Sequence, residues 1–113
     1  MQRRDYIVIN KILSEIDIAF DMIGDSALSD FLNNEMLQRA VSMTVINIGE
    51  LVKTITDETR LEYSNIPWKA IAGMRDIAAH KYQTLRMEDV YNTVMIDLPY
   101  LRMQLRDIID NHN

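Results

Sequence analysis

A nine-residue stretch in the second half of the chain, Met74–Tyr82, carries the side chains best suited to chemistry. It contains Arg75, His80 and Tyr82, and His80 is one of only 2 histidines in 113 residues. Histidine can accept or donate a proton near neutral pH, because its unperturbed pKa is about 6.5. Arginine can bind two phosphate oxygens with two parallel N–H donors. Together these residue types suit acid–base chemistry at a phosphate group.

The spacing of the three residues decides whether they can act together. On an ideal helix Tyr82 follows Arg75 by about two turns, so both lie on one face, whereas His80 lies about 140° around from Arg75. The three side chains converge only if the helix ends or bends near Ala79, or if a second copy of the chain completes the site. A surface ion pair between Asp76 and His80, four residues apart, is the simpler structural interpretation. Spacing alone leaves both interpretations open.

Other common reaction centres are missing from the sequence. There is no cysteine, so disulfides and thiolate metal sites are excluded. No His-Glu-x-x-His pattern is present, the acidic residues lack the spacing of a calcium loop, and neither a glycine-rich phosphate loop nor Gly-x-Ser-x-Gly occurs. Hydrolysis through a serine triad or a bound metal is therefore disfavoured. What remains is proton transfer by His80 beside a cation, and we expect it to need no metal and no cofactor.

The charge balance argues against broad electrostatic capture of duplex nucleic acid. The formal net charge is -5 and the isoelectric point is about 4.9, whereas such capture needs a basic surface. Four cations, Lys69, Arg75, Lys81 and Arg86, nevertheless lie close together in the sequence. They could form a small basic site on an acidic body, although an ordinary solvated helix face is the simpler explanation.

Nothing in the sequence marks export or membrane insertion. Arg3 and Arg4 are not followed by the uninterrupted apolar run of a signal peptide. No window approaches the roughly 20 apolar residues of a membrane span. The absence of cysteine fits a reducing compartment. We therefore expect a soluble, cytoplasmic protein that does not associate with membranes.

Length and composition favour one α-helical domain over residues 1–113. A chain of this length with 48% apolar residues can bury a core without disulfides. Apolar residues recur three and four apart over residues 3–23 and again over residues 35–56, which predicts two long amphipathic helices. The two stripes are Tyr6, Ile9, Leu13, Ile16, Phe20 and Ile23, and Leu37, Val41, Val45, Ile48, Val52 and Ile55.

Breaker residues indicate how the helices are connected. Gly24 should end the first helix, and residues 57–65 should form a polar connection. Pro67 suits the first turn of a third helix. A fourth helix begins near Arg86 and should kink or break near Pro99, because proline removes a backbone hydrogen bond. Four main helices with short connections predict an up-and-down helical bundle.

The predicted helix surfaces are more apolar than one small bundle requires. Met36, Ala40 and Met43 flank the stripe of the second long helix, and the chain has 8 methionines. Exposed apolar flanks usually mean self-association or a partner, so we expect a homodimer. On the same helix Asn47 and Glu50, three residues apart, are polar neighbours that could line a site or simply face solvent.

Several short motifs, taken in order, resemble those of the HepT-like toxins, a branch of the HEPN superfamily. Arg75, His80 and Tyr82 are similar to the Arg-x4-His-x-Tyr motif of that family. A bare Arg-x4-His pair occurs often by chance, but this resemblance covers essentially the whole chain. The other matching segments are Ile48-Gly49-Glu50, Ile66-Pro67-Trp68, Ile71-Ala72-Gly73-Met74-Arg75 and Asp97-Leu98-Pro99.

The resemblance implies a dimeric, HEPN-like helical bundle that acts as a metal-independent endoribonuclease toxin of a type VII-like toxin–antitoxin pair. Arg75 and His80 match the catalytic pair at the dimer interface. Tyr82 matches the tyrosine to which the cognate antitoxin, a minimal nucleotidyltransferase of the MntA type, transfers AMP to neutralise the toxin. The implied substrate is RNA, with tRNA among the candidates.

The resemblance also implies residues that surround the catalytic pair and contact substrate. Asn47 and Glu50 fall where the family tends to carry polar helix residues, and Asp76 and Lys81 adjoin the motif. Asp76 departs from the family pattern, in which asparagine commonly follows the arginine, and adds a negative charge beside the phosphate site. Two alternatives stay open: a non-catalytic HEPN scaffold or nucleotide-binding partner of a minimal nucleotidyltransferase, which the acidic isoelectric point favours, and a purely structural helical dimer.

Overall fold

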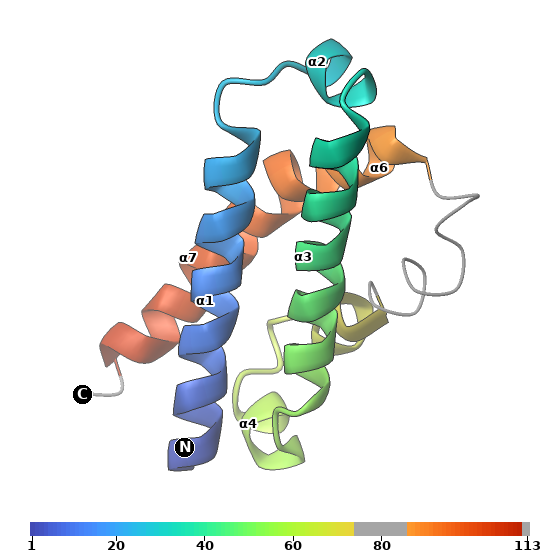
Figure 1. The fold of residues 1–113 in the computed structure, drawn as a ribbon. Coiled ribbons are helices and arrows are strands. Elements are labelled where there is room, and N and C mark those ends of the chain that lie inside the picture. Colours follow the sequence, from blue (N-terminus) through green and yellow to red (C-terminus); the bar gives the residue numbers. More distant parts are fainter. Residues whose placement is uncertain (74–85, 112–113) are drawn as a thin grey trace.

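Two long antiparallel helices, α1 (Arg3–Ile23) and α3 (Glu35–Lys53), lie side by side at the centre of the fold (Figure 1). The computed structural model describes residues 1–73 and 86–111. Within these ranges every regular element is helical, which confirms the predicted all-α bundle. The remaining elements are α2 (Leu28–Leu32), α4 (Asp57–Glu62), a helical segment at 68–73, α6 (Met87–Asn92), the π-helical turn η2 (Thr93–Asp97) and α7 (Leu98–Asn111).

The buried face of α1 follows the predicted spacing of apolar residues and packs on α3 and α7. The helix ends at Gly24, whose N–H donates to the Phe20 carbonyl at 2.8 Å and whose φ is 50°. Glycine adopts this conformation without the clash that a Cβ atom would cause. The apolar residues buried from α1 are Ile9, Ile12, Leu13, Ile16, Ala19 and Ile23, and Tyr6 and Phe20 are half-buried.

Both ends of α3 are held by side chains. At its start, the Asn34 side-chain oxygen accepts a hydrogen bond of 3.0 Å from the Leu37 N–H, which caps the first turn. At its end, the Arg60 guanidinium donates to the carbonyls of Val52 at 2.9 Å and Ile55 at 3.2 Å, which adds a side-chain cap to the last turn. The helix ends slightly earlier than the sequence predicts. Its buried stripe is Val41, Val45, Ile48 and Val52.

The short helix α2 closes the end of the bundle where the chain turns from α1 into α3 (Figure 1). Phe31 is fully buried, and its ring centroid lies 5.5 Å from that of Tyr91 on α6. The Tyr91 hydroxyl donates to the Ser26 carbonyl at 2.7 Å. The connection between the first two long helices is thereby joined to the last helical region.

The prediction of a simple polar connection over residues 57–65 is wrong, because α4 lies within it. The completely buried carboxylate of Asp5 organises the start of α4. It accepts hydrogen bonds from the Thr56 N–H at 3.1 Å, the Thr56 hydroxyl at 2.5 Å and the Thr59 hydroxyl at 2.6 Å. A helix of 6 mostly polar residues has no apolar stripe to reveal it, and its buried partner is remote in the sequence.

The last helical region is interrupted close to Pro99, as predicted. α6, η2 and α7 follow one another directly, and the Leu98 N–H donates to the Thr93 carbonyl five residues earlier. Proline has no N–H to donate, and its ring crowds the carbonyl four residues before it, so a wider turn relieves the strain. One buried stripe passes through all three elements: Val90, Val94, Leu98, Leu101, Leu105 and Ile108.

Candidate functional site

The motif residues identified from the sequence lie outside the described residues. Arg75, Asp76, His80, Lys81 and Tyr82 all fall between the two described ranges. The structure describes the chain on either side of the motif, with the helical segment 68–73 before it and α6 after it.

Trp68 fixes the chain that leads into the motif. Its indole is buried, and its Nε1–H donates a hydrogen bond of 3.0 Å to the Tyr63 carbonyl. Pro67 precedes it at the start of the helical segment 68–73, as predicted, where a missing N–H costs nothing. The helical segment thus starts from a fixed point seven residues before the motif arginine.

α6 fixes the chain that leaves the motif. Arg86 precedes its first turn, and Met87 packs on α3, where the hydroxyl of the buried Ser42 donates to the methionine sulfur at 3.9 Å. Arg86 itself is exposed and pairs with Glu88 at 3.3 Å. Of the four cations that cluster in the sequence, Arg86 is therefore engaged in an ion pair and Lys69 is exposed. The other two lie outside the described residues.

Asn47 and Glu50, the candidate substrate-binding residues on α3, do not share one hollow. Asn47 is half-buried and lines a shallow polar hollow of about 310 Å³ between α1 and α3. Glu50, one turn further on, is exposed and is not part of this lining. The other lining residues are Lys11, Ser14, Glu15 and Leu51.

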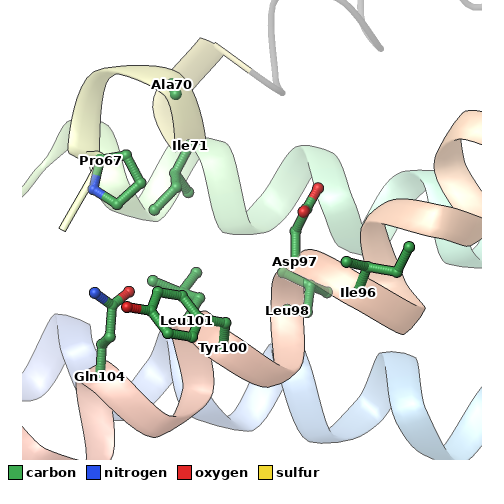
Figure 2. A pocket seen from close by; sticks show the side chains of 9 residues that line it. All are labelled: Pro67, Ala70, Ile71, Ile96, Asp97, Leu98, Tyr100, Leu101 and Gln104. Carbon is green, nitrogen blue, oxygen red and sulfur yellow. The ribbon is translucent and has the colours of Figure 1, made fainter.

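A larger groove opens between the start of the third helix and α7 (Figure 2). Its volume is about 590 Å³, within the range of small-molecule sites. Figure 2 shows Pro67 and Ile71 on one side, facing Tyr100 and Leu101 across the space. We call it the α7 groove; its lining is Pro67, Ala70, Ile71, Ile96, Asp97, Leu98, Tyr100, Leu101 and Gln104.

Two acceptor groups of the α7 groove lack a partner among the described residues. The Gln104 Oε1 atom is buried without a hydrogen bond, while the amide nitrogen of the same side chain lies 3.5 Å from the Asn65 carbonyl oxygen. The exposed Asp97 carboxylate forms no ion pair there, and Figure 2 shows it rising from its helix toward the layer that carries Ile71. A buried acceptor without a donor costs free energy, so Gln104 requires an explanation.

The sequence motifs include only part of the groove lining, with Pro67 and Ile71 on one side and Asp97 on the other. Asp97 belongs to the Asp97-Leu98-Pro99 segment, but no motif includes Gln104. A second apolar stripe in the last helical region is the sequence signal that could have indicated this groove. Ile96, Tyr100 and Met103 recur four and three residues apart and are exposed by 67%, 60% and 54%. The opposite wall comes from residues much earlier in the sequence, which no local pattern links to α7.

Neither a metal cluster nor a helix able to cross a membrane occurs in residues 1–73 and 86–111. No three His, Cys, Asp or Glu side chains in these ranges come together as metal ligands would. None of the helices there combines the length and the apolar character of a membrane span.

Comparison with known proteins identifies relatives of this chain. The family described as "Ribonuclease HepT-like" matches residues 12–108. A "Putative RNase" of Caldanaerobacter subterraneus subsp. tengcongensis is 33% identical over 98 residues, which cover 87% of this chain and 88% of the relative. A "Putative RNase" of Methanocaldococcus jannaschii is 34% identical over 98 residues, 87% of this chain and 84% of the relative. A "Probable ribonuclease HepT" of Thermococcus cleftensis is 29% identical over 99 residues, 88% of each chain.

No solved structure matches the chain. The family match nevertheless spans most of its length and includes all three motif residues. The names of the relatives support ribonuclease activity, and the family fits an RNA substrate. The resemblance seen in the sequence is therefore confirmed, and this chain belongs to the HepT-like ribonuclease family.

Proposed function

We propose that this protein is a metal-independent endoribonuclease toxin in which Arg75 and His80 cut RNA at a homodimer interface. The observation that carries the proposal is the family match over residues 12–108, which contains the Arg-x4-His-x-Tyr sequence. The described structure supports it by giving the motif fixed flanks. Trp68 is hydrogen-bonded before the motif, and Met87 packs on α3 after it.

The proposed reaction needs a proton acceptor, a proton donor and a cation. The RNA 2′-hydroxyl loses its proton to one histidine and attacks the adjacent phosphorus. The bond from phosphorus to the 5′-oxygen breaks, and that oxygen takes a proton from a second histidine, leaving a 2′,3′-cyclic phosphate and a 5′-hydroxyl. Two copies of His80 across a dimer would fill both roles. Arg75 would bind the phosphate and stabilise the charge that builds up on it.

Exposed apolar surface supports self-association. Met36 and Met43, on the predicted flank of α3, are 83% and 55% exposed. Large apolar side chains exposed in this way are typical of surfaces that bind a partner. A second copy would also bring a histidine to each arginine, although His80 lies about 140° from Arg75 on an ideal helix.

AMP transfer to Tyr82 is the proposed means of control. A cognate nucleotidyltransferase of the MntA type would form a bond between the tyrosine oxygen and the α-phosphorus of ATP, with pyrophosphate as the leaving group. The attached AMP adds bulk and negative charge beside Arg75 and His80, which would exclude the RNA phosphate. The pair would then be a type VII-like toxin–antitoxin system.

Cleavage of a labelled RNA pool that includes tRNA, measured in EDTA, tests the proposal. We expect the wild type to leave cyclic phosphate ends, and Arg75→Ala and His80→Ala each to reduce the rate by roughly 100-fold or more. The mass of the intact chain is measured first, because AMP on Tyr82 would silence the enzyme.

Two variants serve as matched controls. His112→Ala removes the only other histidine, and Arg106→Ala removes an exposed α7 arginine paired with Asp110 at 3.4 Å. Both should cut RNA at the wild-type rate. If an unmodified, dimeric wild type leaves all RNAs intact, the nuclease proposal is wrong, and the non-catalytic scaffold or nucleotide-binding partner takes its place.

A further inference from the structure

The α7 groove has the shape of a slot for a flat apolar ligand. Pro67 and Ile71 form one side, and Leu101 and Tyr100 form the other (Figure 2). Tyr100 remains 60% exposed, so its ring is available to a ligand. Unstacked bases of single-stranded RNA commonly bind against aromatic side chains in this way.

Besides the Tyr100 hydroxyl, which can donate or accept, the slot contains two hydrogen-bond acceptors without a partner in the described structure, the Asp97 carboxylate and the Gln104 Oε1 atom. Asp97 and Gln104 are seven residues apart, so on a helix they lie on the same side and are separated by about 10 Å along the axis. The Gln104 Oε1 atom is buried and has no donor in the described structure. A carboxylate can only accept hydrogen bonds. A ligand that satisfies this slot must therefore bring N–H donors at its edge.

We propose that the α7 groove binds one base of the RNA substrate and prefers guanine, an inference that rests on the proposed ribonuclease function. Guanine presents two adjacent donors, N1–H and the N2 amino group, which the two oxygens of the Asp97 carboxylate can accept together. On that edge each of the other three bases presents only one donor group, next to at least one acceptor. Gln104 supplies a further acceptor at the other end of the groove.

Positive charge adjoins the groove, which favours RNA over a protein partner. Pro67 and Ala70 also line a shallow hollow that contains Arg60 and Lys69. A strand with its base in the α7 groove could therefore place phosphates next to these cations. Ala70 precedes Arg75 by five residues in the sequence, so the base site and the proposed phosphate site belong to neighbouring parts of the chain.

Titration calorimetry of the full chain with the four ribonucleoside monophosphates tests the site. We expect the guanine nucleotide to bind most tightly, and Asp97→Asn and Gln104→Leu to weaken its binding roughly tenfold or more, the discrimination expected of a good paired contact to a base. Asp107→Asn is the matched control, because Asp107 is an exposed α7 carboxylate outside the groove lining. Circular dichroism confirms that each variant is folded.

Sequencing of the cleavage products supplies the second readout. We expect wild type to favour guanine at one position next to the cut, and Asp97→Asn to lose this preference while still cutting. If cleavage proceeds but no nucleotide binds and Asp97→Asn keeps the wild-type preference, the groove is not a base site. Guanine nucleotide binding by a wild type that cuts no RNA would instead contradict the proposed function and leave the nucleotide site intact. Loss of dimer mass in Asp97→Asn or Gln104→Leu would show a protein interface and overturn the base site.

Discussion

The Asp5 carboxylate and the Thr56 N–H are joined by a hydrogen bond of 3.1 Å although 51 residues separate them. Hydroxyl groups of Thr56 and Thr59 donate to the same carboxylate at 2.5 and 2.6 Å. These bonds connect the first turn of α1 to the start of α4, at the far end of the long helix pair from α2 (Figure 1). A buried charge with three donors is costly to disturb.

Asp5→Asn should therefore destabilise the fold. In asparagine an NH2 group replaces one carboxylate oxygen, so a donor faces a donor and one of the three hydrogen bonds is lost. The remaining hydrogen bonds weaken, because their acceptor is no longer charged. We expect the free energy of unfolding to fall by about 2–3 kcal/mol in urea denaturation. Asp21→Asn, at an exposed position on the same helix, should change it by less than about 0.5 kcal/mol. Equal effects of the two substitutions would contradict this assignment.

The same carboxylate predicts a pH dependence of stability. Burial alone would raise the pKa of Asp5, but the hydrogen bonds from Thr56 and Thr59 and the charge of Arg4 outweigh burial and hold the pKa below its usual range. Its stabilising contribution is therefore complete above the unfolded pKa of about 3.9 and is lost as pH falls through the folded pKa. Between about pH 4 and pH 2 the Tm of the wild type should fall more steeply than that of Asp5→Asn. Parallel curves from thermal unfolding would argue against it.

Arg60→Ala should weaken the end of α3. The Arg60 guanidinium donates to two carbonyls there, those of Val52 and Ile55, and alanine leaves both without this donor. We expect a loss of about 1–2 kcal/mol in the free energy of unfolding. Arg60→Lys should recover only part of it, because an ammonium lacks the planar fork that reaches both oxygens. Arg106→Ala, which breaks an exposed ion pair, should cost less than about 0.5 kcal/mol, and a similar cost for Arg60→Ala would refute the capping role.

Asp76→Asn should increase the rate of RNA cleavage. If Arg75 binds the scissile phosphate, the adjacent negative charge opposes binding, and removing one unit charge near it is worth about 1 kcal/mol in water, or roughly fivefold in rate. The initial rate on one labelled RNA measures the effect. Asp89→Asn, an exposed acid in the first turn of α6, should leave the rate unchanged. A slower Asp76→Asn enzyme would mean that the carboxylate assists the reaction or the fold.

The long helices could be predicted because their signals are local. α1 has a continuous apolar stripe that stops at Gly24, and α3 has a second stripe that begins after Asn34. Each signal lies within the element that it defines. The interruption near Pro99 was predictable for the same reason, since the cost of proline in a helix does not depend on distant contacts.

The elements that the sequence did not reveal depend on contacts between distant segments. α4 is short and polar, and the buried partner at its start, Asp5, looks like a solvent-facing residue of the first helix. The α7 groove exists only because Pro67 and Ile71 meet α7. At the candidate site, residue types and motif order were sufficient to identify the family, whereas the homodimer and the roles of Arg75 and His80 stay predictions.

The π-helical turn Thr93–Asp97 has a consequence for insertions and deletions in this region. In a regular helix each residue turns by 100°, so two steps of four residues would leave the Leu98 side chain about 80° around the helix axis from that of Val90, with Val94 between them. One extra residue taken up in a wide turn subtracts about 100°, so all three side chains stay in the core. Deleting one residue there would preserve the rotation of α7 but place Pro99 inside a regular helix, at a cost of about 3 kcal/mol. The additional residue and the proline should therefore be gained or lost together as this lineage diverges.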